Sequence, residues 1–204
     1  MKKSVFIGKL LSGLFLFIAI TCNAAASAEP DRARYKDYVS SGNHFQCRIP
    51  ADWSVDYPGF GLSEEEKKVY GVTLTGPQND GPLSPIISVY YYAPGNLLHN
   101  TMDVYIRRHT ASNLNFETEG KAYGKVSEVE IAGRKAKIFE RTDIRLVGGR
   151  VLNPTKVPVY EKFVTVSAKS GEGFYVLRLS VPVRIKDEYP ALFEETVKSF
   201  LPGN

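Results

Sequence analysis

Residues 45–53 read Phe45-Gln46-Cys47-Arg48-Ile49-Pro50-Ala51-Asp52-Trp53. Apolar and polar side chains alternate from Phe45 to Ile49, which is the period-two pattern of a strand with one buried face. Because proline cannot donate a backbone hydrogen bond, Pro50 predicts the end of this strand. Cys47 falls on the apolar side of the alternation. We interpret it as a small buried residue rather than a nucleophile, which would need exposure and a lowered pKa.

Outside this stretch, the chain alternates between short strands and turn signals. Strand patterns occupy residues 69–74, 86–92, 125–131, 134–141, 159–168 and 174–181, and amphipathic helices are predicted after Asn100-Thr101 and at Tyr189-Pro190. A two-residue turn at 132–133 places Glu130 opposite Lys135, so a hairpin is expected there. Glycine and proline predict loops at residues 76–85 and 144–158. These elements predict an α+β fold, an antiparallel β-sheet flanked by helices.

Three motifs resemble the PsbP-like domain family. Residues 45–53 resemble the family's opening Phe-x-φ-x-Ile-Pro-x-x-Trp strand, where φ is apolar; residues 130–136 resemble its central glycine hairpin, and residues 197–200 its closing helix with a terminal Ser-Phe. The resemblance spans about residues 44–201. It implies an α/β/α sandwich, a fold shared with an extrinsic photosystem II protein and a Ran-binding nuclear import factor. The matching motifs are structural, so the resemblance assigns no functional residue.

The first 28 residues have the order of a secretory signal. Lys2 and Lys3 precede an apolar run at residues 10–20, and Ala26-Ser27-Ala28 provides a cleavage site after Ala28. The apolar run is too short for a membrane helix. We therefore predict three parts: a signal peptide at 1–28, an N-terminal segment at 29–43 and a single PsbP-like domain at 44–204. The product is exported, to the periplasm or the medium. In the alternative, acylation of Cys22 anchors a lipoprotein to the membrane, although Thr21 before it disfavours that signal.

The net charge argues against one class of partner, and the cysteine count argues against a disulfide. The formal net charge of the 204 residues is +4, and the leader contains three lysines and no acidic residue, so cleavage lowers it to +1. Such a balance argues against nucleic acid as a partner. Cleavage also removes Cys22, so the mature domain keeps Cys47 alone and has no intramolecular disulfide.

The sequence predicts no catalytic, cofactor-binding or metal-binding residue. It has three histidines and no serine elbow, zinc-protease motif, phosphate loop or paired redox cysteines. His44 and Cys47 are three apart on a strand, so they face opposite sides and cannot share an ion. His109 lies on the apolar stripe of a helix, which is typical of a hydrogen-bonded core histidine. We therefore expect a protein that is not an enzyme and needs no cofactor.

Protein binding is the leading functional hypothesis. Tyr90 and Tyr92 share one face of a strand while Tyr91 takes the other, and uncovered tyrosine rings make good contact surfaces. If helices or loops cover both faces, the rings belong to the core instead. Arg107 and Arg108 point away from the apolar stripe of their helix and complete the predicted protein-contact surface. The hypothesis is an exported, non-catalytic binding or assembly domain acting through a protein partner in a bacterial-type cell envelope.

Two alternatives stay open. A small-molecule or lipid carrier would need an apolar cavity between sheet and helices. Aromatic residues such as Phe139, Phe163, Phe174 and Phe193 would line it. Without such a cavity, these rings simply fill the hydrophobic core. A hydrolase would need a histidine or paired carboxylates that only folding brings together in a cleft.

Overall fold

In the computed structural model, the described residues are 34–56, 61–78, 80–111, 120–148, 154–169, 171 and 173–203. The chain divides into two compact units, Met1–Pro30 and Asp31–Asn204, and every described residue belongs to the second. The predicted signal, its cleavage point at Ala28 and the alternative lipid site Cys22 lie outside the described residues. None of the helices in the described part has the length and apolar character of a membrane span.

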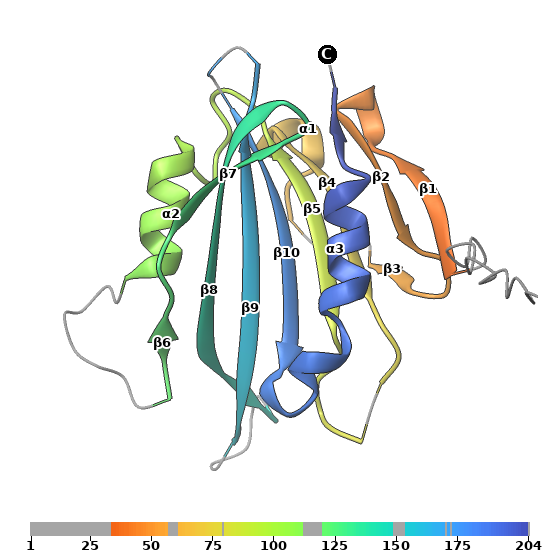
Figure 1. Ribbon diagram of the computed structural model, residues 1–204, viewed down its shortest axis with the longest axis vertical. Coiled ribbons are helices and arrows are strands. Elements are labelled where there is room, and N and C mark those ends of the chain that lie inside the picture. Colours follow the sequence, from red (N-terminus) through yellow and green to blue (C-terminus); the bar gives the residue numbers. More distant parts are fainter. Residues whose placement is uncertain are drawn as a thin grey trace, which may run out of the picture. The chain divides into compact units, whose positions relative to one another are not determined.

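The described residues form an eight-stranded sheet in which every pairing is antiparallel (Figure 1). Its strands, in spatial order, are β3 (Ser54–Asp56), β4 (Val69–Thr75), β5 (Ile86–Tyr92), β10 (Phe174–Pro182), β9 (Thr155–Ser167), β8 (Arg134–Val147) and β6 (Ala122–Tyr123), with β7 (Ser127–Ile131) also paired to β8. The predicted α+β class with an antiparallel sheet is confirmed.

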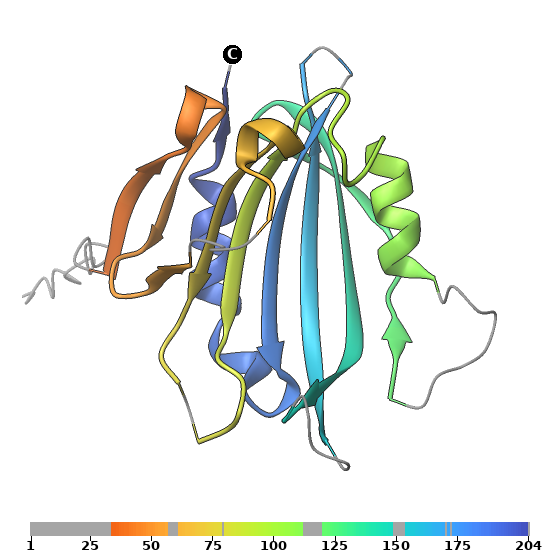
Figure 2. The same ribbon diagram turned by 180° about the vertical axis from the view of Figure 1, so that it is seen from behind.

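Helices cover parts of both faces of this sheet (Figures 1 and 2). On one face α3 (Pro190–Lys198) packs Phe193 into a core cluster with Leu177 and Leu179 of β10. On the other face α2 (Met102–Thr110) packs Tyr105 and Ile106 with the aromatic rings of β8, β9 and β10. This is the α/β/α layering that the resemblance implied. A short helix, α1 (Glu64–Lys67), precedes β4, and a 3-10 helix, η3 (Val183–Glu188), precedes α3.

The stretch at 45–53 forms β2 (Phe45–Pro50), with its apolar side chains buried as predicted. Its place in the fold is less expected, because β2 lies in a separate three-stranded sheet between β1 (Tyr35–Val39) and β11 (Leu201–Pro202). Cys47 pairs with Tyr38 of β1, and Gln46 pairs with Leu201 of β11. Segments from the two ends of the described chain thus meet on β2, with the short 3-10 helix η2 (Ser41–Asn43) between β1 and β2.

The hairpin of β7 and β8 has the predicted register. Glu130 lies opposite Lys135 and Val129 opposite Ala136. Ala132 and Gly133 at its turn have φ of 50° and 72°. Positive φ at both central residues is the requirement of a type I′ turn, whose twist matches that of the flanking strands.

The predicted loop at 144–158 is wrong at both ends, because β8 and β9 continue as a paired hairpin as far as Val147 opposite Thr155. Pro158 is tolerated inside β9 because the pairing with β10 ends at Val159, so only β8 flanks the strand beyond that point. This end of the hairpin is mostly exposed on both faces. It therefore lacks the alternation of a half-buried strand, and its structure is seen in the pairing of β8 with β9.

Candidate binding groove

The three tyrosines of β5 pack against both faces of the sheet. Tyr91 stacks on Tyr175 with 4.7 Å between ring centroids, and Tyr92 stacks on Phe174 of the other face at 4.9 Å. The Tyr90 hydroxyl is hydrogen-bonded to Thr73 Oγ1 at 2.7 Å. The strand is thus partly covered on each side, and burial raises the pKa of Tyr92 to about 12.

Tyr90 and Tyr92 nevertheless line a groove of about 650 Å³ at the β4 side of the sheet. Its other walls come from β1, η2, β3, α1, β4 and the loop before α2. Three large apolar side chains on separate elements border it and are strongly exposed: Val39 (54%), Leu62 (51%) and Leu98 (46%). Leu97, beside Leu98, is 63% exposed. We call this surface the leucine groove.

The buried side chain of Asn96 fixes the loop that presents Leu97 and Leu98. Its Nδ2 donates to the carbonyl oxygens of Ala93 and His99, at 2.9 and 2.7 Å. Its Oδ1 accepts from the backbone N–H groups of Leu98 and His99, at 3.1 and 2.7 Å. The Leu97 N–H donates to the Lys67 carbonyl at 3.0 Å, which ties the loop to α1. The part of the apolar rim at Leu97 and Leu98 is therefore held in place by hydrogen bonds.

Helix α1 closes the β4 side of the groove through its run of glutamates. Ser63 and Glu66 form a reciprocal capping box. Glu64 Oε1 accepts the Gly71 N–H of β4 at 2.9 Å, and Glu65 Oε2 accepts the Tyr70 hydroxyl at 2.8 Å. These carboxylates hold the helix against β4.

Arg108, one of the two predicted arginines, lies beside the groove. Both are exposed on α2, and Arg108 Nη1 donates to the Leu98 carbonyl at 3.3 Å. Arg107 points to solvent. The structure thus brings Tyr90, Tyr92 and Arg108 to one region, and places Tyr91 on the opposite face. Sequence reasoning missed Asn96, Leu97 and Leu98, although two adjacent leucines before a helix start are a signal for an exposed apolar site.

The histidines are packed against aromatic rings. His109 Nδ1 is hydrogen-bonded to the Tyr105 carbonyl at 2.8 Å, and its ring stacks on Tyr105 at 4.1 Å, as expected of a core histidine. His99 lies 6.1 Å from His109 between ring centroids. Burial, with the neighbouring charges of His109 and Arg108, lowers the pKa of His99 to about 4. Burial also lowers the pKa of His109.

Cys47 and the four phenylalanines named for a carrier are core residues. Cys47 is 4% exposed, and burial raises the pKa of its thiol to about 12. Phe139, Phe163, Phe174 and Phe193 are each 0–1% exposed, which agrees with packed core rather than a cavity lining. Among the described residues, no group of three or more His, Cys, Asp or Glu side chains is arranged to hold a metal ion.

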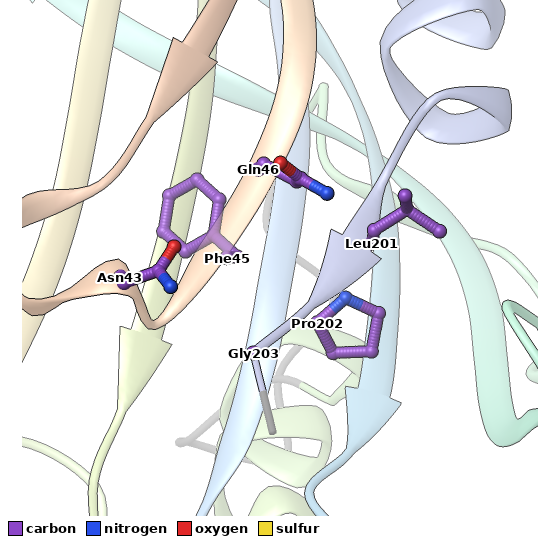
Figure 3. Close-up of a pocket in the computed structure, with 6 residues that line it drawn as sticks. All are labelled: Asn43, Phe45, Gln46, Leu201, Pro202 and Gly203. Atoms are coloured by element: carbon purple, nitrogen blue, oxygen red, sulfur yellow. The ribbon is translucent and has the colours of Figure 1, made fainter.

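A smaller hollow of about 320 Å³ lies where β11 pairs with β2 (Figure 3). Asn43, Gln46 and Leu201 are among the residues that line it. The Gly203 N–H donates to the His44 carbonyl at 2.6 Å, and Arg134 Nη2 donates to the Gly203 carbonyl at 3.1 Å. These bonds fasten the end of the described chain, so we assign this hollow a structural role.

No family of known proteins and no curated protein matches this chain by sequence. Among solved structures, it is similar to the Ran-binding protein Mog1p of Saccharomyces cerevisiae, with a TM-score of 0.48 and 10% identity over 82% of this chain and 95% of that chain. The fold class given above rests on the strand order and registers of this chain, and no property of Mog1p is transferred to it.

Proposed function

We propose that the chain is an exported, non-catalytic binding domain that acts through protein–protein contacts in a bacterial-type cell envelope. The leucine groove would receive apolar side chains of the partner protein. The main support is the exposure of Val39, Leu62 and Leu98 around one groove, each close to half exposed. Soluble proteins seldom expose large apolar side chains together unless they meet a partner.

Rigidity of the rim favours binding. The four hydrogen bonds of Asn96 fix the backbone around Leu98 before any partner arrives, so less conformational entropy is lost on association. Tyr90 and Tyr92 add aromatic surface to the wall, and aromatic rings contribute strongly at the centre of interfaces. The packed state of Cys47, His99 and His109 is consistent with a non-catalytic role.

Export is inferred from the leader at residues 1–28 and its cleavage site at Ala28. Cleavage there would release the domain to the periplasm or the medium. If Cys22 is acylated instead, the same domain would face its partner from a membrane surface.

The test uses affinity purification of the tagged protein from gently solubilised envelopes of the source cells. We expect one protein to co-elute in stoichiometric amount and to be lost from the Leu98→Asp and Leu62→Asp variants. Leu146→Asp is the matched control, because Leu146 is 62% exposed and lies at the far end of β8. A companion retained by all three variants would place the contact elsewhere.

Organic extraction of the same preparation checks the carrier alternative. A lipid or small apolar molecule that is released from the unaltered protein and absent from Leu98→Asp would favour a carrier that uses this groove. The volume of the leucine groove is within the range of small-molecule sites.

A further inference from the structure

A buried carboxylate on β9 is surrounded by three arginines. Glu161 has 0% exposed surface. Its Oε2 lies 2.5 Å from Arg141 Nε, and its Oε1 lies 3.2 Å from Arg145 Nη2 and 3.8 Å from Arg178 Nη1. Arg141 is directly opposite Glu161 in the pairing of β8 with β9, and Arg178 comes from β10 on the other side. We call Arg141, Arg145 and Arg178 the arginine cluster.

The cluster has more positive than negative charge. Asp143 is the second carboxylate nearby, 3.7 Å from Arg141 Nη2 and 2.9 Å from Lys121 Nζ. Burial alone would raise the pKa of Asp143, but the hydrogen bonds from Lys121 and the Ile144 N–H outweigh it and lower that pKa. Among the residues that the structure describes, four cationic side chains therefore share two carboxylates, which leaves an excess of two positive charges within that set.

Donor capacity is also left over. A guanidinium has five N–H donors, and the contact with Glu161 uses one nitrogen of each arginine. Arg178 Nε is buried and has no acceptor among the described residues. A buried donor without an acceptor is unfavourable. Neutralising Glu161 does not require three guanidinium groups, and it leaves the Arg178 Nε donor without an acceptor among the described residues.

The cluster is reachable from solvent. The side chain of Arg145 is 44% exposed and that of Arg178 is 26% exposed, while Arg141 is held more deeply at 16%. In Figure 2 the middles of β5 and β10 have no described helix in front of them, since α2 lies toward β8 and α3 is behind the sheet. Arg178 is opposite Phe163 in the pairing of β10 with β9, and Phe163 packs in the cluster that contains Tyr105 of α2, so Arg178 is on the α2 face of the sheet. A ligand would approach the cluster from this face.

We propose that the arginine cluster is an oxyanion-binding site, which takes a carboxylate or phosphate group of a ligand, with Glu161 as the buried group that orients the guanidiniums. Planar guanidinium groups bind two oxygens of such anions at once, with geometry that lysine does not offer. An incoming anion would offset the excess charge and give the free donors an acceptor. This proposal is independent of the leucine groove.

The experiment measures thermal unfolding of the full chain in inorganic phosphate and in citrate, each against sodium chloride of equal ionic strength. We expect at least one of the two anions to raise Tm above the chloride control by an amount that saturates with anion concentration, because a ligand that binds only the folded state stabilises it. Exclusion of phosphate and citrate from the protein surface also raises Tm, but that effect does not saturate. NMR of the arginine Nε–H groups in the same titration should show saturable movement of the Arg178 signal. Which anion binds more tightly then identifies the source as phosphate or carboxylate.

Variants make the test specific. Arg145→Gln and Arg178→Gln should each weaken anion binding by about tenfold or more, since each removes a charged donor. Arg145 is partly exposed, so its replacement tests the proposal even if Arg178→Gln fails to fold. Arg107→Gln, an exposed arginine of α2, should bind as the unaltered protein does. Equal Tm in the anions and in chloride, or binding unchanged by Arg145→Gln, would overturn the proposal.

Discussion

Cys47 shows how burial determines the chemistry of one residue. It is 4% exposed in β2, and burial raises the pKa of its thiol to about 12, so the reactive thiolate is scarce at neutral pH. We predict that the native protein labels at Cys47 with a maleimide at least about a hundredfold more slowly than the unfolded chain. Peptide mapping after timed labelling measures this rate for Cys47 alone. Rapid native labelling would mean that the β2 region opens readily.

The two packed histidines predict an acid-sensitive fold. Burial keeps the pKa of His99 near 4 and that of His109 below its ordinary value, whereas an unfolded histidine titrates near about 6.5. The unfolded chain therefore binds more protons below that pH, and stability present above about pH 6.5 is lost as pH falls toward 4. Urea unfolding between about pH 7 and 5 should give a midpoint that falls steadily.

The charged groups near the two histidine rings do not reverse the direction of this pH dependence. Arg108 acts on His99, while Arg141 and Arg178 oppose Glu161 around His109. The double variant His99→Gln, His109→Gln should lose most of the slope in this pH range. Arg107→Gln, which removes a charge from α2 without removing a histidine, should keep it. A slope that survives the double variant would assign the acid sensitivity to the carboxylates instead.

At the scale of elements, Gly71 of β4 marks a close approach between strands. A Cβ there would lie 2.1 Å from the backbone oxygen of Val89 on β5. Because backbone cannot move aside as a side-chain tip does, Gly71→Ala should destabilise the fold by about 2–4 kcal/mol. Gly133→Ala is the control: its φ is 72° and a Cβ meets nothing within 4 Å, so only about 1 kcal/mol of backbone strain is expected. Denaturant unfolding compares them, and equal losses would contradict the clash.

Elements could be predicted from sequence where local chemistry defines them. The β7–β8 register followed from charges counted outward from a two-residue turn, and α2 begins directly after Asn100-Thr101, as predicted, with Thr101 as its N-cap. Prediction failed where only backbone pairing defines the structure. The far end of the β8–β9 hairpin is mostly exposed on both faces, and β11 is only two residues long. Such segments have no apolar periodicity, so their strand state depends on a partner that the local sequence does not reveal.

At the scale of the whole molecule, the candidate sites depend on distant residues. Sequence analysis named Tyr90, Tyr92 and Arg108 because their types favour contact surfaces, and the fold places them near the leucine groove. Val39, Leu62 and Leu98 are far apart in sequence, so their convergence follows from the tertiary structure alone. The arginine cluster likewise joins β8, β9 and β10. Individual residue types were visible in the sequence, whereas their grouping was not.

The groove also predicts a separation of binding from stability. Leu98→Asp changes a side chain that is 46% exposed, so unfolding free energy should move by less than about 0.5 kcal/mol. Partner binding should nevertheless weaken strongly, because a carboxylate would have to be buried in an apolar contact. Circular dichroism melts of Leu98→Asp and the Leu146→Asp control check the first part. A large loss of stability would mean that Leu98 belongs to the core.

Site-specific photo-crosslinking in living source cells tests the binding account most directly. A photoreactive amino acid replaces Leu98 in one strain and Leu146 in another, and mass spectrometry identifies the crosslinked products. We expect the Leu98 probe to crosslink to one envelope protein, through an apolar segment of that protein, and the Leu146 probe not to do so. No adduct from Leu98, or the same adducts from both positions, would contradict the assignment of the leucine groove as the contact surface.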